Sequence, residues 1–466
     1  MEYTVCNNPK ERSSLPVKKR FFNTTHIILI SFLAVVLLGS LLLSLPISTK
    51  SGESVPYIDA LFTATTSTCV TGLVTVPTFS TWSVFGQVVI LVLIQVGGLG
   101  VITVMTGFML ALKRRMGLSD RLLIQDAFNL NTLSGLAAFV KKVILGTFLV
   151  EGVGALLFMC VFIPEYGAVG IWYGVFHAIS AFCNAGIDLL SENSLSAYAC
   201  NPLVNFTTSA LVILGGLGFV VWWDLLKVLK EFPKKKFRTF RFLTLHSKIA
   251  LAVTAVLLFG GTIAFLLLEY NNPRTMGDLS LFDKIQTAFF QSMTTRTAGF
   301  FTLPQQGLTD ASAALSVVLM FIGGSPVGTA GGVKTVTIAV LLAATVSTVK
   351  SKDHTALFGR RISADSLRKA VGVVCISFGV LLVATVALST VTEAPFLDVL
   401  YETASAIATV GLSRNLTSYL SMAGKWIIIC CMYMGRVGHI SFALAFNRKG
   451  ANYNLVKEPT EDISVG

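Results

Sequence analysis

Charge is scarce in this sequence. Only 13% of the 466 residues are charged, whereas 53% are hydrophobic and the mean hydropathy is +0.74. Soluble globular chains carry about 25% charged residues, so the composition excludes that class and indicates an integral membrane protein. The eight cysteines form no CxxC pair and show no zinc-ligand spacing, which excludes a cysteine-based zinc motif. We interpret the cysteines as small hydrophobic residues.

A nucleotide-binding motif is also missing, although one stretch comes close. GGSPVGTAGGVKT (Gly323–Thr335) is rich in glycine and contains a lysine, but Val333 separates Gly332 from Lys334. A Walker A motif needs Gly-Lys-Ser/Thr in direct succession, because the lysine folds back over the phosphate that the preceding amides hold. The flanking residues are apolar, and no strand pattern precedes them. We therefore expect no ATPase, and no enzyme.

Long apolar runs are frequent. A helix that crosses a bilayer needs about 20 such residues. Eight runs meet this requirement, at 27–48, 82–112, 143–163, 203–226, 249–268, 311–346, 370–391 and 419–446. The first run follows the basic stretch Val17–Arg20 and is long enough to be a span rather than a secretory signal. We predict an all-α membrane protein with eight transmembrane helices.

The basic residues lie mainly on one side of these runs. The segments 1–26, 113–142, 227–248, 347–369 and 448–466 hold 28 of the 36 Lys and Arg residues. The connections on the other side hold five basic and twelve acidic residues. By the positive-inside rule, both termini of this multi-pass membrane protein are expected to be cytoplasmic. The net charge of +12 is then a topology signal, so no nucleic-acid partner is expected, and the acidic outer face favours cations.

A fourfold repeat lies in the connections on the acidic side. The segments IDALFTATTSTCVTGL (58–73), WYGVFHAISAFCNAGI (172–187), IQTAFFQSMTTRTAGF (285–300) and VLYETASAIATVGL (399–412) align on one glycine each. Successive glycines, Gly72, Gly186, Gly299 and Gly411, are 114, 113 and 112 residues apart. Each unit starts and ends on the basic side, so the units are parallel. We predict four repeats of span, re-entrant loop and span around one central pore, at 27–112, 139–227, 249–346 and 369–447, between cytoplasmic termini 1–26 and 448–466.

The repeated glycines point to ion coordination. A dehydrated cation needs a cage of oxygen atoms, which backbone carbonyls supply where glycine permits unusual dihedral angles. A short helix ahead of each loop directs its partially negative end at the axis. We predict a selectivity filter made by three residues of each unit, called the filter loops below: Val70, Thr71, Gly72; Asn184, Ala185, Gly186; Thr297, Ala298, Gly299; Thr409, Val410, Gly411. In the alternative interpretation, Asn184, Thr297 and Thr409 hold the loops from behind by hydrogen bonds.

The sixth run is too long for one span. Its 36 residues would measure about 54 Å as a straight helix, against a hydrocarbon core of about 30 Å. A break in the glycine-rich stretch solves this, and irregular backbone at membrane depth must line a cavity. We predict a gate loop just inside the filter, formed by Gly323, Gly324, Ser325, Pro326, Val327, Gly328, Thr329, Ala330, Gly331, Gly332 and Lys334. The alternative is a static kink.

Two arginines fall in apolar surroundings. Arg436 lies midway through the eighth run, where a charge costs about 2.5 to 3.5 kcal/mol unless it faces water or a partner. We predict that it forms a positive barrier in the pore beside the gate loop; the alternative is a pair with a buried acid such as Glu151. Arg296, three residues before Gly299, is expected to hydrogen-bond loop carbonyls or an acid rather than to touch the ion.

These motifs together resemble the Trk/Ktr/HKT superfamily of potassium transporters over about residues 27–447. They are TSTCVTGL (66–73), FCNAGI (182–187), TTRTAGF (294–300) and ATVGL (408–412), with the glycine-rich stretch and MGRVGH (434–439). Eight spans and short termini are similar to the bacterial Ktr-type membrane subunit. The resemblance implies potassium uptake, and glycine in all four loops is the family pattern associated with potassium preference over sodium.

The resemblance also implies ions and partners. Potassium is the expected ion, sodium is a second candidate that uptake could depend on, and no organic cofactor is expected in this chain. Ktr-type members work in the lipid bilayer as homodimers on a separate cytosolic ring of RCK subunits of the KtrA type, which bind ATP or ADP. The rival hypothesis is an alternating-access cation carrier, as in transporters with inverted repeats.

Overall fold

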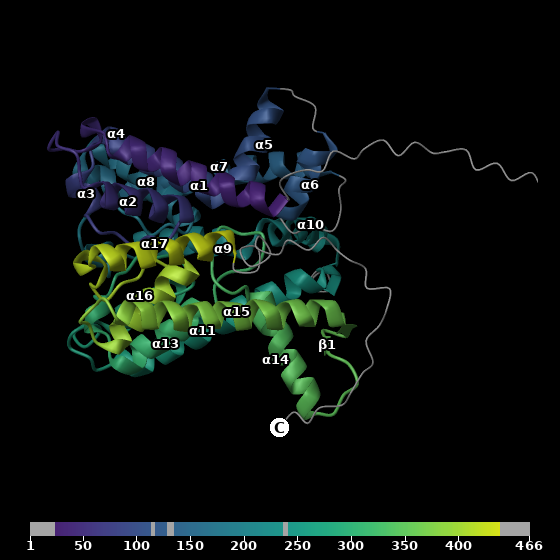
Figure 1. Cartoon of the computed structure of the whole chain (residues 1–466). Coiled ribbons are helices and arrows are strands. Elements are labelled where there is room, and N and C mark those ends of the chain that lie inside the picture. The colour runs from purple at the N-terminus through teal and green to yellow at the C-terminus, as the bar shows by residue number, and fades with distance from the viewer. Residues whose placement is uncertain (1–23, 113–116, 128–134, 236–240, 439–466) are drawn as a thin grey trace, which may run out of the picture.

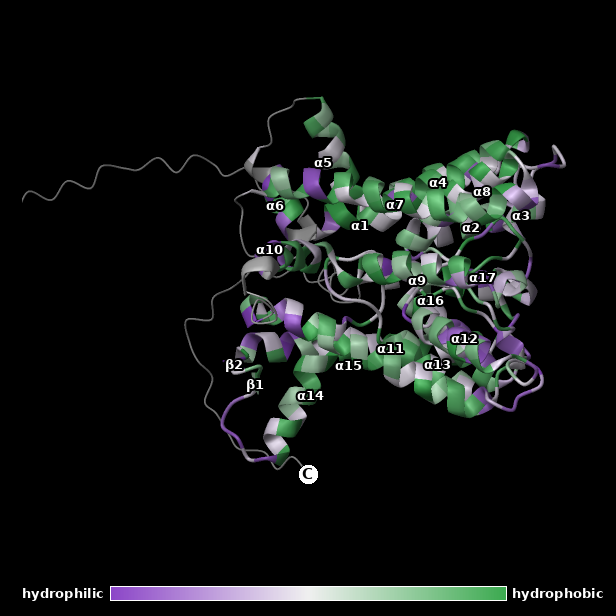
Figure 2. Cartoon of the chain, turned by 180° about the vertical axis from the view of Figure 1, so that it is seen from behind, coloured by the Kyte–Doolittle hydropathy of each residue, from purple (hydrophilic) through white to green (hydrophobic). Residues whose placement is uncertain are grey.

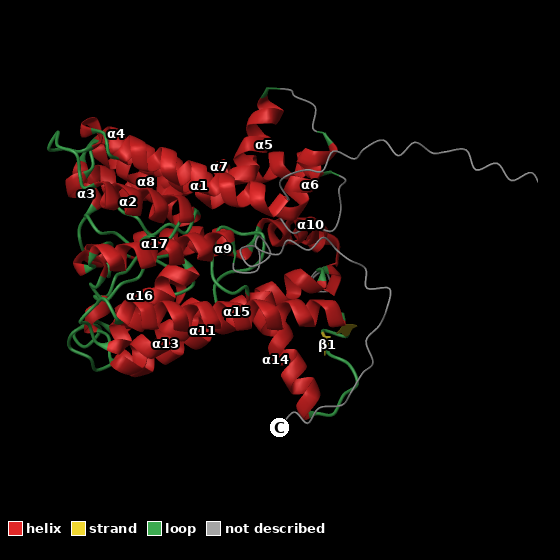
Figure 3. Ribbon diagram, viewed as in Figure 1, coloured by secondary structure: helices red, strands yellow, loops and turns green. Residues whose placement is uncertain are grey.

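The computed structural model describes residues 24–112, 117–127, 135–235 and 241–438 of the chain. The predicted cytoplasmic C-terminus 448–466, most of the N-terminal segment 1–26 and His439 of the MGRVGH motif lie outside the described residues. The described part is mostly helical (Figure 3), which confirms the predicted predominance of helix. Its strands are β1 (Ala356–Leu357) and β2 (Arg360–Arg361), which form one antiparallel pair.

Four long helices run in roughly the same direction through the molecule (Figure 1) and are apolar enough to cross a bilayer. They are α1 (Thr24–Leu43), α7 (Leu136–Tyr166), α11 (Leu245–Glu269) and α15 (Ala364–Ser389). Large apolar side chains on them point outward: Leu149 is 69% exposed, Leu267 75% and Val383 71%. Figure 2 shows these apolar flanks, with polar residues gathered in the connections at both ends. So much exposed apolar surface indicates lipid as the surrounding solvent.

The second helix of each predicted unit reaches a glycine-rich joint. The helices on either side are α4 (Val84–Leu99) and α5 (Val101–Ala111), α9 (Pro202–Leu217) and α10 (Phe219–Lys235), α13 (Asp310–Phe321) and α14 (Thr335–Val349), and α17 (Met422–Val437). The chain bends by 96° between α4 and α5, and by 101° between α9 and α10. Gly100, Gly218 and Gly438 at these joints have φ of 85°, 87° and 95°, a region that glycine enters without a steric penalty.

These joints correct the sequence analysis, which expected a break in the sixth run alone. Runs 82–112 and 203–226 each form two helices because a glycine reverses φ between them. Counting each bent pair as one span gives up to six apolar spans in the described residues, so the eight-span arrangement stays a prediction. The overlooked pattern is GGLG at Gly97–Gly100 and Gly215–Gly218, with GRVG at Gly435–Gly438.

Four shorter helices lead into the filter loops. They are α2 (Tyr57–Cys69), α8 (Val169–Phe182), α12 (Leu281–Thr294) and α16 (Phe396–Ala408). Each packs against the long helix that precedes it in the chain, α1, α7, α11 and α15 respectively. The connections also contain α3 (Thr78–Thr81), α6 (Leu118–Ala127) and single turns of 3-10 helix at Pro46–Ser48, Ser196–Tyr198, Gln305–Gly307 and Thr417–Tyr419. The fold therefore sets four short helix ends, and the loops after them, inside the bundle.

Candidate functional site

The four filter glycines lie against one another in a closed ring. In each unit, a Cβ atom placed on the glycine would lie less than 3.0 Å from the carbonyl oxygen just before the next unit's glycine. The pairs are Gly72 with Ala185, Gly186 with Ala298, Gly299 with Val410, and Gly411 with Thr71. The order runs through units one to four and back to one. Four chain segments more than 100 residues apart thus meet at one point, where no side chain fits.

The backbone of the filter loops alternates in handedness. In each loop the first residue and the glycine have positive φ, and the middle residue does not. The values are 56° and 100° in unit one, 60° and 66° in unit two, 68° and 82° in unit three, and 52° and 96° in unit four. A left-handed non-glycine residue costs about 1 to 2 kcal/mol, so the surrounding fold must hold it there. Alternating dihedrals of this kind can direct successive carbonyls to one side, which is the geometry that the predicted filter requires.

Hydroxyl groups of the short helices hold the filter loops from behind. Gly72 N donates to Thr66 Oγ1 at 2.9 Å, and Gly411 N donates to Ser405 Oγ at 3.0 Å. Ser180 Oγ bonds both the N–H and the carbonyl of Ile187 in unit two, and Thr294 Oγ1 donates to the carbonyl of Phe300 in unit three. These hydroxyls occupy the supporting position that the alternative interpretation gives to Thr297 and Thr409, whose own hydroxyls have no partner. Asn184 differs, because its side chain bonds Thr329 of the gate loop.

Several buried side-chain groups in the filter loops have no partner in the protein. They are the hydroxyls of Thr71, Thr297 and Thr409 and the amide nitrogen of Asn184. Buried polar atoms normally have a hydrogen-bond partner, so these four groups are candidates for contact with an ion or water, and the filter stays a prediction. Eleven of the twelve filter-loop residues are buried, and the twelfth, Gly411, is half-buried.

The gate loop follows α13 and folds back on itself. Gly323 N donates to Val333 O and Thr335 N donates to Gly324 O, both at 3.0 Å. The hydroxyls of Ser325 and Thr335 lie 3.0 Å apart. Lys334 Nζ donates to Ala330 O within the loop at 2.7 Å. The loop is therefore a closed structure with its own internal bonds.

The gate loop is bonded to the joint of unit two. Ser325 N donates to Gly216 O at 2.9 Å, and Thr329 N donates to Gly215 O at 3.1 Å. Phe219 N at the start of α10 donates to Val327 O at 3.0 Å. Val327 has a φ of 63°, and Gly332 one of 65°. The loop therefore lies in a defined place against α9 and α10.

The gate loop also touches the filter loops. Thr329 Oγ1 lies 3.0 Å from Asn184 Oδ1 and 3.1 Å from Phe182 O in unit two. In unit four, a Cβ atom on Gly331 would overlap the hydroxyl of Thr409 and lie 2.6 Å from Ala408 O. The structure thus brings the predicted gate residues directly against the predicted filter, between units two and four.

Arg436 lies on backbone carbonyls. Its guanidinium donates to Thr329 O in the gate loop, and to Gly97 O and Gly98 O at the end of α4. The carboxyl-terminal end of a helix is partially negative, which favours a cation there. Glu151 accepts from Gln95 Nε2 at 3.2 Å instead, so the alternative pairing of Arg436 with Glu151 is wrong. Arg436 joins unit four to unit one and to the gate loop.

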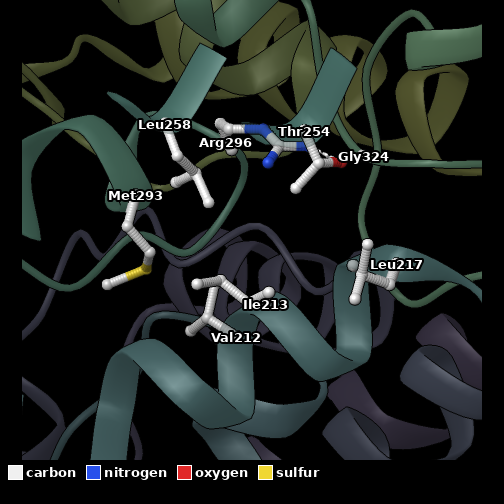
Figure 4. A pocket seen from close by; sticks show the side chains of 9 residues that line it. Val212, Ile213, Leu217, Thr254, Leu258, Met293, Arg296 and Gly324 are labelled. Atoms are coloured by element: carbon white, nitrogen blue, oxygen red, sulfur yellow. Dashed lines mark hydrogen bonds between the residues drawn. The ribbon is translucent and has the colours of Figure 1, made fainter. Parts of the chain in front are cut away.

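Arg296 lines a small, mostly apolar cavity (Figure 4). It is 7% exposed, and its Nη2 donates to Thr254 Oγ1 on α11 at 3.2 Å. Its Nε has no partner. The cavity is lined by Val212, Ile213, Gly216, Leu217, Thr254, Leu258, Met293, Arg296 and Gly324. Arg296 therefore bonds a threonine hydroxyl on the neighbouring helix α11 instead of the expected loop carbonyl or acid.

An apolar helical bundle that encloses a ring of glycine loops indicates a multi-pass membrane protein, in which irregular backbone is sheltered from lipid. The chain matches the TrkH family model, described as cation transport protein, over residues 9–455. It belongs to this family, which confirms the resemblance to Trk and Ktr proteins. The pairing of Arg436 with carbonyls and the contact of Thr329 with Asn184 could not be read from the sequence.

Known relatives match over nearly the full length. The chain is 38% identical to the potassium/sodium uptake protein NtpJ of Enterococcus hirae, covering 97% of this chain and 98% of that one. It is 38% identical to the Ktr system potassium uptake protein B of Bacillus subtilis, covering 96% and 97%. The crystal structure of the potassium transporter TrkH from Vibrio parahaemolyticus has the same fold, with a TM-score of 0.74, 16% identity, and coverage of 92% and 86%.

Proposed function

We propose that this chain mediates potassium uptake across the plasma membrane, with sodium as a second candidate ion that uptake could depend on. The closed ring of Gly72, Gly186, Gly299 and Gly411 carries the proposal. Relatives that share 38% of their residues with it are named as potassium or potassium/sodium uptake proteins. The membrane potential drives entry, because moving one positive charge inward across 100 mV releases about 2.3 kcal/mol.

The ion path runs through the ring. Left-handed residues such as Val70 and Thr409 turn carbonyl oxygens toward the axis, where they replace the water shell of the cation. The unpartnered hydroxyls of Thr71, Thr297 and Thr409 supply further oxygen atoms close by. Eight spans in four parallel units surround this path, with both termini cytoplasmic. The recurrence of the glycine joint near Gly100, Gly218 and Gly438 supports that arrangement.

The gate loop closes the path below the filter. It touches filter loops two and four, and its carbonyl at Thr329 is bonded to Arg436. A guanidinium beside the axis repels cations, and its bond holds the loop in place. Opening requires that the loop and Arg436 separate. A static kink would need no such bond between the loop and unit four.

The partners follow from the Ktr type. We infer a homodimer in the bilayer, and a separate cytosolic RCK ring of the KtrA type that binds ATP or ADP and moves the gate loop. Support comes from relatives named as components of a Ktr system. No organic cofactor is proposed in this chain.

Rubidium uptake tests the proposal. Purified protein in lipid vesicles is given an inside-negative potential, and 86Rb⁺ entry is measured with and without sodium. We expect uptake that follows the potential and is inhibited by potassium more strongly than by sodium. Uptake that does not depend on the imposed potential would overturn the proposed function. Single conductance events in a planar bilayer separate a pore from the rival hypothesis, an alternating-access cation carrier.

A further inference from the structure

Thr329 belongs to the gate loop but bonds to a filter loop. Its Oγ1 lies 3.0 Å from Asn184 Oδ1 and 3.1 Å from Phe182 O. A hydroxyl carries one proton and cannot donate to both acceptors. The amide nitrogen of Asn184 is buried and unpartnered. With that amide turned so that Nδ2 donates to Thr329 Oγ1, the hydroxyl can donate to Phe182 O, and the contact between Thr329 and Asn184 is a hydrogen bond in either orientation of the amide.

Of the four residues that begin the filter loops, only Asn184 has a side-chain hydrogen bond. The equivalent Val70 has no polar side chain, and the hydroxyls of Thr297 and Thr409 have no partner. Asn184 holds a left-handed φ of 60°, which needs support from its surroundings. That support comes from Thr329, 145 positions further along the chain. Filter loop two is thus held in part by the gate loop.

The gate loop is attached unequally to its two neighbours. Toward unit two it has bonds from Ser325 N, Thr329 N and Thr329 Oγ1, and it accepts one from Phe219 N. Toward unit four, the bond from Arg436 to Thr329 O holds it, beside the close approach of Gly331 to Thr409. If the gate loop separates from unit four rather than from unit two, fewer hydrogen bonds are broken. Thr329 can then stay on Asn184 while the path opens.

We propose that Thr329 is a specificity-determining residue, which positions Asn184 and so keeps filter loop two in its selective geometry in closed and open states. This inference rests on the proposed function of the filter loops. Thr329 acts through Asn184 and does not contact the ion. It predicts that loss of the Thr329 hydroxyl lowers ion preference, whereas loss of other hydroxyls in the gate loop does not.

The test compares three single variants in vesicles, reading 86Rb⁺ uptake and its inhibition by sodium. Thr329→Val keeps the shape of the side chain and removes the bond; the loss of one hydrogen bond corresponds to a fall of about two- to tenfold in rubidium-over-sodium preference. Thr329→Ser retains the hydroxyl and is expected to keep the preference. Ser325→Ala removes the hydroxyl contact with Thr335 and is the matched control, expected to leave preference unchanged.

A double variant shows whether Asn184 is the intermediate. If it is, Asn184→Ala lowers the preference, and adding Thr329→Val lowers it no further. A Thr329→Val protein with altered flux and wild-type preference would overturn the inference and leave Thr329 a gate residue alone. Wild-type protein without potential-driven, potassium-preferring uptake would instead overturn the proposed function itself. Retained uptake in Thr329→Ser shows that the site folds.

Discussion

Lys425 of α17 and Asp59 of α2 form an ion pair with 2.6 Å between Nζ and Oδ1. The two side chains are only 17% and 9% exposed. The pair joins the last predicted unit to the first, on the side where the filter ring also closes through Gly411 and Thr71. Ring closure between chain segments 366 positions apart is therefore fixed by charge as well as by packing.

Breaking this pair is expected to destabilise the protein. Lys425→Met leaves the Asp59 carboxylate without its cation, which costs about 3 kcal/mol for a buried pair. Thermal unfolding in detergent measures the loss. Adding Asp59→Asn to Lys425→Met should recover part of the stability, because no buried charge is then unpaired. A Lys425→Met protein that unfolds like the wild type would show that the pair contributes nothing.

Gly72→Ser is expected to lower potassium preference over sodium. Gly72 has a φ of 100°, and a Cβ atom there would lie 2.6 Å from Ala185 O, so the side chain must displace a carbonyl of filter loop two. Gly52→Ser is the matched control, because Gly52 also has a positive φ of 75° but no neighbour within 4 Å. Rubidium and sodium uptake are compared in both variants. Unchanged selectivity in Gly72→Ser would remove filter loop one from the filter.

Arg436→Ala is expected to raise the rate of uptake several-fold. The substitution removes a positive charge beside the path and the bond that holds Thr329 O. Arg436→Lys keeps the charge, but one ammonium cannot reproduce the fork that bonds Thr329, Gly97 and Gly98 together. An intermediate rate is therefore expected for it. Wild-type rates and ion preference in Arg436→Ala would contradict the barrier.

Deletion of residues 327–330 is expected to raise flux and to lower ion preference. It removes the part of the gate loop that bonds Phe219, Asn184 and Arg436. Uptake is measured in the same lipid vesicles, in which we expect the intact loop to limit the flux. The Ser325→Ala protein serves as control for a change in the loop that leaves these bonds in place. Flux equal to that of the intact chain would favour a static kink.

Uptake is expected to fall as the pH outside drops through about 6. Asp188, two residues after Gly186, lies in the connection predicted to be external, and burial raises the pKa of its carboxyl to about 6. Above that pH the carboxylate is negative and attracts cations to the entrance; below it, the group is neutral and the attraction is lost. Asp188→Asn should show low uptake without this pH step. A step of the same size in Asp188→Asn would assign it to another group.

The filter loops could be predicted because their dihedral angles leave a trace in the sequence. Only glycine fits where four backbones meet, so Gly72, Gly186, Gly299 and Gly411 recur at nearly equal spacing. The joint at Gly218 also has a glycine pattern in the sequence. It was missed because the apolar run 203–226, which includes α9 and the start of α10, has the length of a single span. The gate loop could be predicted from the length of the sixth run, because a straight helix of 36 residues is longer than the bilayer is thick.

The contacts around the gate could not be predicted in the same way. Arg436 needs a partner at membrane depth, and the sequence offers Glu151 as readily as any carbonyl. Which one it meets depends on how units one, three and four lie around the axis. The bond between Thr329 and Asn184 likewise joins residues 145 positions apart, and neither residue type signals the other.

The gate loop is an enlarged version of a joint that other units share. One residue separates the two helices in unit one (Gly100) and in unit two (Gly218). In unit three, the 13 residues 322–334 separate α13 from α14, which makes this joint twelve residues longer. The proposed control of flux would then reside in an insertion within one copy of a repeated unit. A change in the length of that insertion would alter the control of flux and leave the other three copies, with their filter loops, as they are.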